Sequence, residues 1–109
     1  MAEVVTTVNE ADFEQEVLRS AQTVLVDFYA DWCGPCRLTA PIIEQIAQEN
    51  KDPNFKIVKV DIDAAKQLAA DLVIKSIPTF KIFKNGEEVA SIVGAHTKKG
   101  FLTFIEENK

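Results

Sequence analysis

Cysteine, histidine and long apolar runs are scarce or missing in this chain, and each shortage argues against a class of protein. Two cysteines in 109 residues are too few for a disulfide-rich secreted scaffold. One histidine leaves the cysteine pair short of the four ligands that a zinc site usually needs. No apolar run approaches the roughly 20 residues of a membrane-spanning helix, so we expect no membrane association.

Basic residues are also in the minority, with 12 Lys and Arg against 17 Asp and Glu and a net charge of −5. They are scattered along the chain, which argues against nucleic acid or an anionic membrane as the main partner. The acidity favours solubility. The first ten residues contain neither a basic nor an apolar region, so we expect no secretory signal.

What the chain does contain is a balance typical of a globular protein. Hydrophobic residues make up 47 % and charged residues 27 %. A chain of this length suits one compact domain with one core, so we expect residues 1–109 to form a single domain.

The hydrophobic pattern alternates between strands and helices. It predicts strands over residues 4–8, 24–30, 55–62, 79–83 and 88–93, and helices over 10–20, 34–50, 64–72 and from 98 onward. Alternating units imply parallel strands, and Asn85-Gly86 predicts a hairpin that adds an antiparallel edge. The predicted fold class is α/β, with a central mixed β-sheet flanked by helices on both faces.

The same pattern assigns individual side chains. Asn9 and Thr97 are expected to cap the helices that follow them. Asp61 and Asp63 are interpreted as the end of a strand and a cap for the next helix rather than as metal ligands, and His96 as a surface residue. The inward stripes of the two longer helices are predicted to contain Leu38, Ile42, Ile43, Ile46 and Ala47, and Phe101, Leu102 and Ile105.

The two cysteines, Cys33 and Cys36, lie between the end of a strongly apolar strand and the start of a helix. Sites in open α/β sheets form at this edge, and a helix N-terminus stabilises the thiolate that attacks disulfides. We expect Cys33 to be exposed and to attack, and Cys36 to be shielded and to resolve the mixed disulfide. Gly34 leaves the backbone open beside the attacking sulfur, and Pro35 stiffens the ring.

Three other interpretations of the pair stay open: a structural disulfide, half of a zinc site, and a chance occurrence. A disulfide that closes so short a loop adds little stability, and His96 is the only other soft ligand. A CxxC motif beside a βαβ pattern favours redox chemistry.

The segment from Trp32 to Cys36, WCGPC, resembles the active-site motif of the thioredoxin family. The resemblance covers nearly the whole chain, because VLVDFYADWCGPCR, API, VKVDID, SIPTF, FKNGE and VGA occur in family order. It implies the thioredoxin fold and a cytoplasmic protein disulfide reductase without a bound cofactor. We expect a monomer, with weak self-association through the apolar surface around Trp32 as the alternative. Thioredoxin reductase would recharge the Cys33–Cys36 disulfide with electrons from NADPH, and disulfide-containing proteins would be the substrates.

The resemblance also implies a cis peptide bond between Ile77 and Pro78, in a loop that offers its backbone to an extended substrate. Pro78 taken alone would be interpreted as a trans proline that begins a strand. The docking surface carried over from the family consists of Trp32, Gly34, Pro35, Ile77, Pro78, Val93, Gly94 and Ala95.

Asp27 places a carboxyl group in the middle of the apolar strand 24–30. Burial should raise its pKa toward physiological pH, where it can take and give a proton. We expect Asp27 to be the general base for Cys36, and the proton donor when the disulfide is reduced. Lys59 is its expected companion, because the lysine at this position in the family approaches the aspartate. The alternatives are a solvated aspartate on an edge strand and a lysine that snorkels to solvent.

Two competing functions remain at this stage. One is an oxidase or isomerase, although Gly-Pro between the cysteines and the missing secretory signal favour a reductase. The other is a redox-independent binding subunit or chaperone that uses the same docking surface, which a double cysteine-to-serine variant would distinguish from an enzyme.

Overall fold

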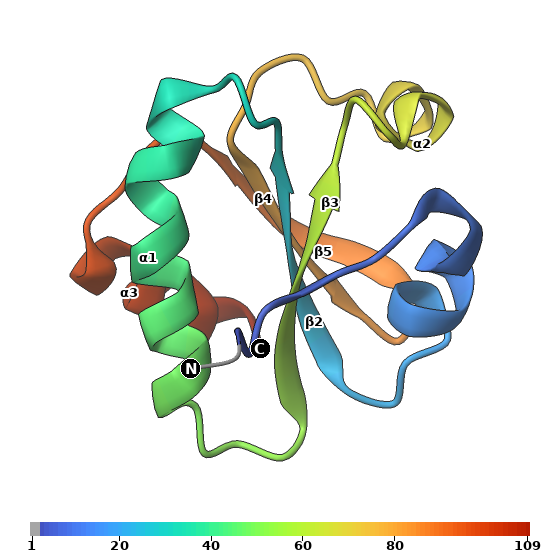
Figure 1. Cartoon of the computed structure of the whole chain (residues 1–109). Helices are drawn as coiled ribbons and strands as arrows, with labels where there is room; N and C mark the ends of the chain where they lie inside the picture. Colours follow the sequence, from blue (N-terminus) through green and yellow to red (C-terminus); the bar gives the residue numbers. More distant parts are fainter. Residues whose placement is uncertain (1–2) are drawn as a thin grey trace.

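The structure is a computed structural model that describes residues 3–109. Within these residues one five-stranded sheet has the order β1-β3-β2-β4-β5 (Figure 1). The strands are β1 (Thr6–Thr7), β2 (Thr23–Tyr29), β3 (Phe55–Asp61), β4 (Thr79–Lys84) and β5 (Glu87–Val93). β1, β3 and β2 run parallel, whereas β4 is antiparallel to both β2 and β5. The predicted mixed sheet with an antiparallel edge is confirmed.

Helices cover both faces of this sheet, as predicted (Figure 1). The α-helices are α1 (Gly34–Glu49), α2 (Lys66–Asp71) and α3 (Lys98–Asn108). α1 and α3 pack on one face, where residues such as Ile43 and Phe101 are buried against Leu25. α2 and the segment between β1 and β2 pack on the other face, against Val24, Val26 and Phe28. Leu25 and the set Val24, Val26 and Phe28 therefore lie on opposite faces of β2, and both faces of this central strand are covered.

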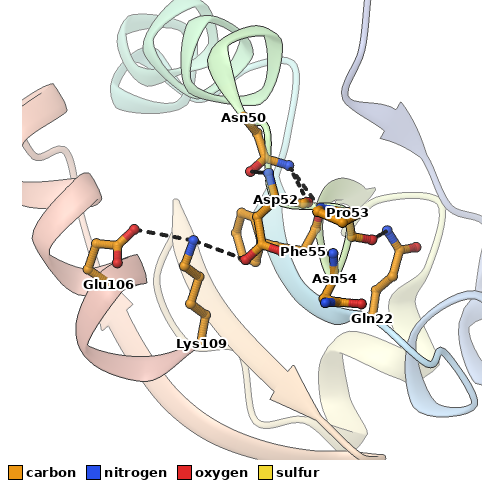
Figure 2. A network of polar contacts seen from close by, with 8 residues as sticks. All are labelled: Gln22, Asn50, Asp52, Pro53, Asn54, Phe55, Glu106 and Lys109. Carbon is orange, nitrogen blue, oxygen red and sulfur yellow. Dashed lines mark hydrogen bonds and ion pairs between the residues drawn. The ribbon is translucent and has the colours of Figure 1, made fainter.

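The turn between α1 and β3 follows the end of α1 that is remote from the cysteines. A network of polar contacts stabilises it (Figure 2). The Asn50 side chain donates to the carbonyl oxygens of Asp52 and Phe55, and accepts the N–H of Asp52. Lys109 joins the turn to α3 through ion pairs with Asp52 and Glu106, each 3.2 Å long. These contacts fix where α1 ends and β3 begins, and hence the register of the strand that carries Lys59.

The segment between β1 and β2 differs from the single helix predicted over residues 10–20. It forms a 3₁₀ turn (Glu10–Asp12) and a π-helical turn (Glu14–Leu18). Asn9 makes no side-chain hydrogen bond as a cap, so that expectation is wrong. Phe13 and Val17 are both buried against the sheet, so the inward-facing residues are those of the predicted helix although its backbone hydrogen bonding is not α-helical. The strand predicted over residues 4–8 is reduced to Thr6–Thr7.

Two residues of the predicted helix stripes face solvent. Leu38 is 70 % exposed and Leu102 is 41 % exposed. Successive helix residues are about 100° apart, and the buried line of α1 passes through Cys36, Thr39 and Ile43, which leaves Leu38 off that line. By contrast, Thr97 caps α3 as predicted, accepting the Gly100 N–H at 3.1 Å.

A helix that crosses a bilayer needs about 20 mainly apolar residues. No helix within residues 3–109 is long and apolar enough to cross a membrane.

Candidate active site

The cysteine pair lies where β2 ends and α1 begins. In the structure Cys33 and Cys36 form a disulfide, with their Cα atoms 5.2 Å apart. Cys33 is the N-cap residue of α1, and its Sγ accepts the Cys36 N–H at 3.2 Å. Because a helix N-terminus carries unpaired N–H groups and a positive partial charge, this position stabilises a thiolate on Cys33 once the disulfide is reduced.

The expected contrast in exposure between the two cysteines is wrong in this disulfide form. Cys33 and Cys36 are each 5 % exposed. Cys33 is covered because its Sγ points at the helix N-terminus and lies 3.7 Å from the Ile77 carbonyl oxygen. Gly34 is open, as expected, since a Cβ atom added there would have no neighbour within 4 Å.

The loop before β4 lies against the cysteines. The Ile77–Pro78 peptide bond is cis, which confirms the implied geometry. Ile77 packs on the cysteine pair, and the Pro78 carbonyl oxygen accepts the Gly94 N–H at 2.8 Å. Val93 is paired with Thr79, directly after this proline. The structure thus brings the distant 77–78 and 93–95 segments together beside the Cys33–Cys36 disulfide.

The residues of the implied docking surface differ in how far they reach solvent. Trp32 is 66 % exposed, and Pro35, Val93 and Ala95 are exposed as well. Gly34, Ile77 and Gly94 are half-buried, whereas Pro78 is buried. The exposed members form an apolar rim around the disulfide.

Trp32 is held by a residue that the sequence did not assign to the site. Its indole Nε1–H donates to the Asp63 carboxylate at 2.8 Å, and the Asp63 N–H donates to the Asp61 carboxylate at 2.9 Å. Neither Asp61 nor Asp63 caps α2, so the expected helix cap is wrong. The helix begins after Ala65, which makes no side-chain cap hydrogen bond. No local signal links Trp32 with a residue 31 positions away in the chain. His96 is exposed, as predicted.

Asp27 is buried below the disulfide, on the face of β2 that α1 covers. Its residue is 5 % exposed, and its Oδ1 has no hydrogen-bond partner among residues 3–109. Burial raises the pKa of Asp27 from 3.8 to about 7, while the nearby Lys59 charge opposes this change. A carboxyl group with this pKa can exchange a proton near neutral pH.

Lys59 lies directly opposite Asp27 in the parallel pair of β2 and β3. Its ammonium group forms an ion pair with Glu3, Nζ to Oε2 3.3 Å, and lies 5.6 Å from the centre of the Tyr29 ring. The expected proximity of Lys59 and Asp27 is confirmed, but the salt-bridge partner of Lys59 is Glu3, which the sequence did not indicate.

A cavity of about 190 Å³ lies beside both the Asp27 carboxyl group and Cys36. Asp27 and Cys36 both line it, together with Ala40 and Lys59. A volume of this size can hold water, whose share of liquid volume is about 30 Å³ per molecule. Within the described chain no group of three or more His, Cys, Asp or Glu is arranged to hold a metal ion.

A disulfide at a helix N-terminus, beside an apolar rim and above a carboxyl group that titrates near pH 7, can exchange electrons with the disulfides of other proteins. The fold and the site therefore define a thiol–disulfide oxidoreductase.

Comparisons with known proteins give the family. The model of the family described as Thioredoxin matches residues 4–107. Thioredoxin 1 of Synechococcus elongatus is 50 % identical over 95 residues, which cover 87 % of this chain and 88 % of that protein. Thioredoxin 1 of Nostoc sp. is 46 % identical over 101 residues, with 93 % and 94 % covered. The chloroplastic M-type thioredoxin of Chlamydomonas reinhardtii is 43 % identical over 100 residues, with 92 % and 71 % covered.

The chain belongs to the thioredoxin family. Its Cys33–Cys36 pair fits the redox-active dithiol of such an oxidoreductase, and a redox-independent binding subunit is not favoured.

Proposed function

We propose that the protein reduces the disulfides of partner proteins, with Cys33 as the attacking and Cys36 as the resolving residue. The observation that carries this proposal is the position of the Cys33 Sγ, which caps α1 and accepts the Cys36 N–H. The Cys33 thiolate attacks one sulfur of the partner disulfide, that bond breaks, and the other partner sulfur leaves as a thiolate that takes up a proton. The Cys36 thiolate then attacks the Cys33 Sγ and releases the second partner thiol. Two electrons and two protons pass to the partner.

Asp27 is the proposed proton acceptor for Cys36. The cavity that both residues line supports this role, because one or two water molecules could relay the proton from thiol to carboxylate. In the opposite direction, Asp27 returns the proton when the disulfide is reduced. Lys59 is proposed to assist by favouring the charged form of Asp27, as its effect on the Asp27 pKa indicates.

The docking surface is proposed to be the apolar rim around the disulfide together with the less exposed residues beside it. It consists of Trp32, Gly34, Pro35, Ile77, Pro78, Val93, Gly94 and Ala95. The open space over Gly34 and the nearby 77–78 and 93–95 segments support a partner strand that lies across the cysteines. The Asp63 hydrogen bond would fix the indole of Trp32 at the edge of this surface.

The physiological setting is proposed from the family. Thioredoxin reductase is the proposed source of electrons, drawn from NADPH, and the protein itself binds no cofactor. We propose a monomer in the cytoplasm, with residues 1–109 as one domain, which the match over residues 4–107 supports. One relative is named as chloroplastic, so an organelle is the alternative location.

The experiment that tests this function is the trapping of a mixed disulfide. Cys36→Ser should accumulate a covalent complex with a disulfide-containing protein such as insulin, because the resolving thiol is missing. Cys33→Ser should form no such complex. Equal trapping by both variants, or trapping by Cys33→Ser alone, would contradict the proposed roles. The double serine variant should lose all disulfide reduction.

A further inference from the structure

A second cavity lies on the far side of Asp27 from the cysteines. It has a volume of about 370 Å³, and Glu3, Val5, Asp27, Pro41, Glu44 and Lys59 are among the residues that line it. It shares Asp27, Ala40 and Lys59 with the smaller cavity that contains Cys36. Asp27 and Lys59 therefore lie between the cysteine side of the site and a space that residues 3–5 border.

Residues 3–5 are anchored at this position by α1. The Glu44 carboxylate accepts the Val5 N–H at 3.0 Å and also the Val4 N–H. Val5 is buried in the core that α1 and the sheet share. The Glu3 side chain is thus presented to β3 by a segment with defined contacts on both sides.

Lys59 has two carboxyl groups near it, the exposed one of Glu3 and the buried one of Asp27. It is paired with the exposed Glu3 carboxylate at 3.3 Å. Its strand position is opposite the buried Asp27, whose Oδ1 lacks a hydrogen-bond partner within the described part of the chain. The positive charge of Lys59 that Glu3 neutralises is not available to stabilise a charged Asp27.

We propose that Glu3 is a positioning residue for proton transfer at Asp27, which acts by pairing with the Lys59 ammonium group and so weakening the effect of its positive charge on the buried carboxyl group. This inference rests on the proposed role of Asp27 as the proton acceptor for Cys36. With Glu3 charged, the protonated form of Asp27 is favoured, and Asp27 is ready to donate a proton when the disulfide is reduced. Without the Glu3 charge, Lys59 favours the carboxylate.

Other ionisable groups border the two cavities, but among residues 3–109 Glu3 is the one that forms an ion pair with Lys59. The ionisable groups around the two cavities are Glu3, Tyr29, Asp31, Cys36, Arg37, Glu44 and Lys59. Glu44 is engaged by backbone N–H groups, and Cys36 does not titrate while it is in the disulfide. On β4 the residue opposite Asp27 is Phe80, which carries no charge.

The test is a direct measurement of the Asp27 pKa by NMR of its side-chain carboxyl carbon, in the oxidised full-length protein. Glu3→Gln should lower this pKa by roughly 0.2–0.7 of a unit, the size of effect that an exposed ion pair produces. The shift should shrink at about 1 M salt, where the Debye length falls to about 3 Å. An unchanged or raised pKa in Glu3→Gln would overturn the inference.

Glu16→Gln is the matched control. Glu16 pairs with Lys56 on the same strand at 3.6 Å, and the side chains of Lys56 and Lys59 are equally exposed, at 26 %. Lys56 is opposite Val24 rather than Asp27. Glu16→Gln removes the same charge from a similar pair and should leave the Asp27 pKa unchanged. A shift equal to that of Glu3→Gln would mean that net charge alone is responsible, and would contradict the inference.

A double variant tests whether Glu3 acts through Lys59. Lys59→Met should raise the Asp27 pKa, and Glu3→Gln added to it should produce little further change. If Glu3→Gln has its full effect without Lys59, the proposed route is wrong. The proposed function is judged separately, by whether Asp27→Asn removes the pH dependence of disulfide reduction near pH 7, so the two can fail independently.

Discussion

At the residue scale, Asp27 carries a carboxyl group at a strand position whose neighbours Val26 and Phe28 are fully buried. The folded protein keeps a proton on this group up to a pKa of about 7, whereas the unfolded chain loses it near 3.8. Between these values the folded state binds more protons than the unfolded state. Asp27 therefore lowers the free energy of unfolding progressively as pH rises from about 4. This loss of stability levels off above about pH 7.

The first prediction concerns Asp27→Ala in the oxidised protein. The variant should be more stable than the parent protein at pH 8, because it removes a buried ionised group. Its advantage should be about 2–3 kcal/mol larger at pH 8 than at pH 5, since each pH unit in this window is worth about 1.4 kcal/mol. Denaturant unfolding at the two pH values measures this difference. A variant that is less stable at pH 8 would show that Asp27 has a structural role.

The second prediction concerns Gly34, where an added Cβ would contact nothing within 4 Å. Gly34→Ala should leave the free energy of unfolding within about 1 kcal/mol of the parent value, because the position is helical and open. It should still slow disulfide reduction, since the added methyl group occupies the space that a partner strand is proposed to approach. Unchanged kinetics with several disulfide-containing proteins would argue against docking over Gly34.

At the element scale, the turn between β4 and β5 depends on backbone conformation more than on side-chain packing. Asn85 and Gly86 both have positive φ angles, of 54° and 82°. A Cβ atom on Gly86 would also lie 3.0 Å from the Leu18 carbonyl oxygen. The turn thus sets the hairpin and places it against the π-helical segment.

The third prediction is that Gly86→Ala destabilises the protein by about 1–3 kcal/mol, through a strained positive φ and a backbone contact that cannot move freely. Thermal or denaturant unfolding measures this loss, with Gly34→Ala as the matched glycine control. The rate of disulfide reduction per folded molecule should stay unchanged, because the turn is at the opposite end of β4 from Pro78. Equal effects of the two substitutions on stability would contradict this account.

The elements that the sequence predicted well are those with a strong local pattern. The apolar runs of β2 and β3, the Asn85-Gly86 turn and the Thr97 cap each depend on adjacent residues, and all are found in the structure. The segment over residues 10–20 differs from the predicted regular helix, because apolar residues four apart, such as Phe13 and Val17, do not distinguish an α-helix from a π-helical turn. The sequence predicts Leu38 on the buried face of α1, whereas it is exposed, because the hydrophobic pattern does not separate an apolar residue on that face from one beside it.

At the scale of the whole molecule, the site combines residues that are adjacent in sequence with residues that only the fold brings together. The CxxC motif, its place at a helix start and the buried Asp27 could be predicted from neighbouring residues and from the family resemblance. The contact of Trp32 with Asp63 and the ion pair of Lys59 with Glu3 could not, because they join positions 31 and 56 residues apart. The burial of Cys33 likewise depends on the distant Ile77.

The central claim is that this dithiol gives electrons to partner disulfides, and the reduction potential of the Cys33–Cys36 pair tests it most directly. Trp32, the only tryptophan, is next to Cys33 and should report the redox state by fluorescence in a series of thiol–disulfide buffers. Known dithiol proteins of this kind span roughly 150 mV, so the two ends are easily distinguished. The account predicts a potential at the reducing end of that span. A potential at the oxidising end would mean that the protein donates disulfides instead, and would contradict the proposed direction of electron transfer.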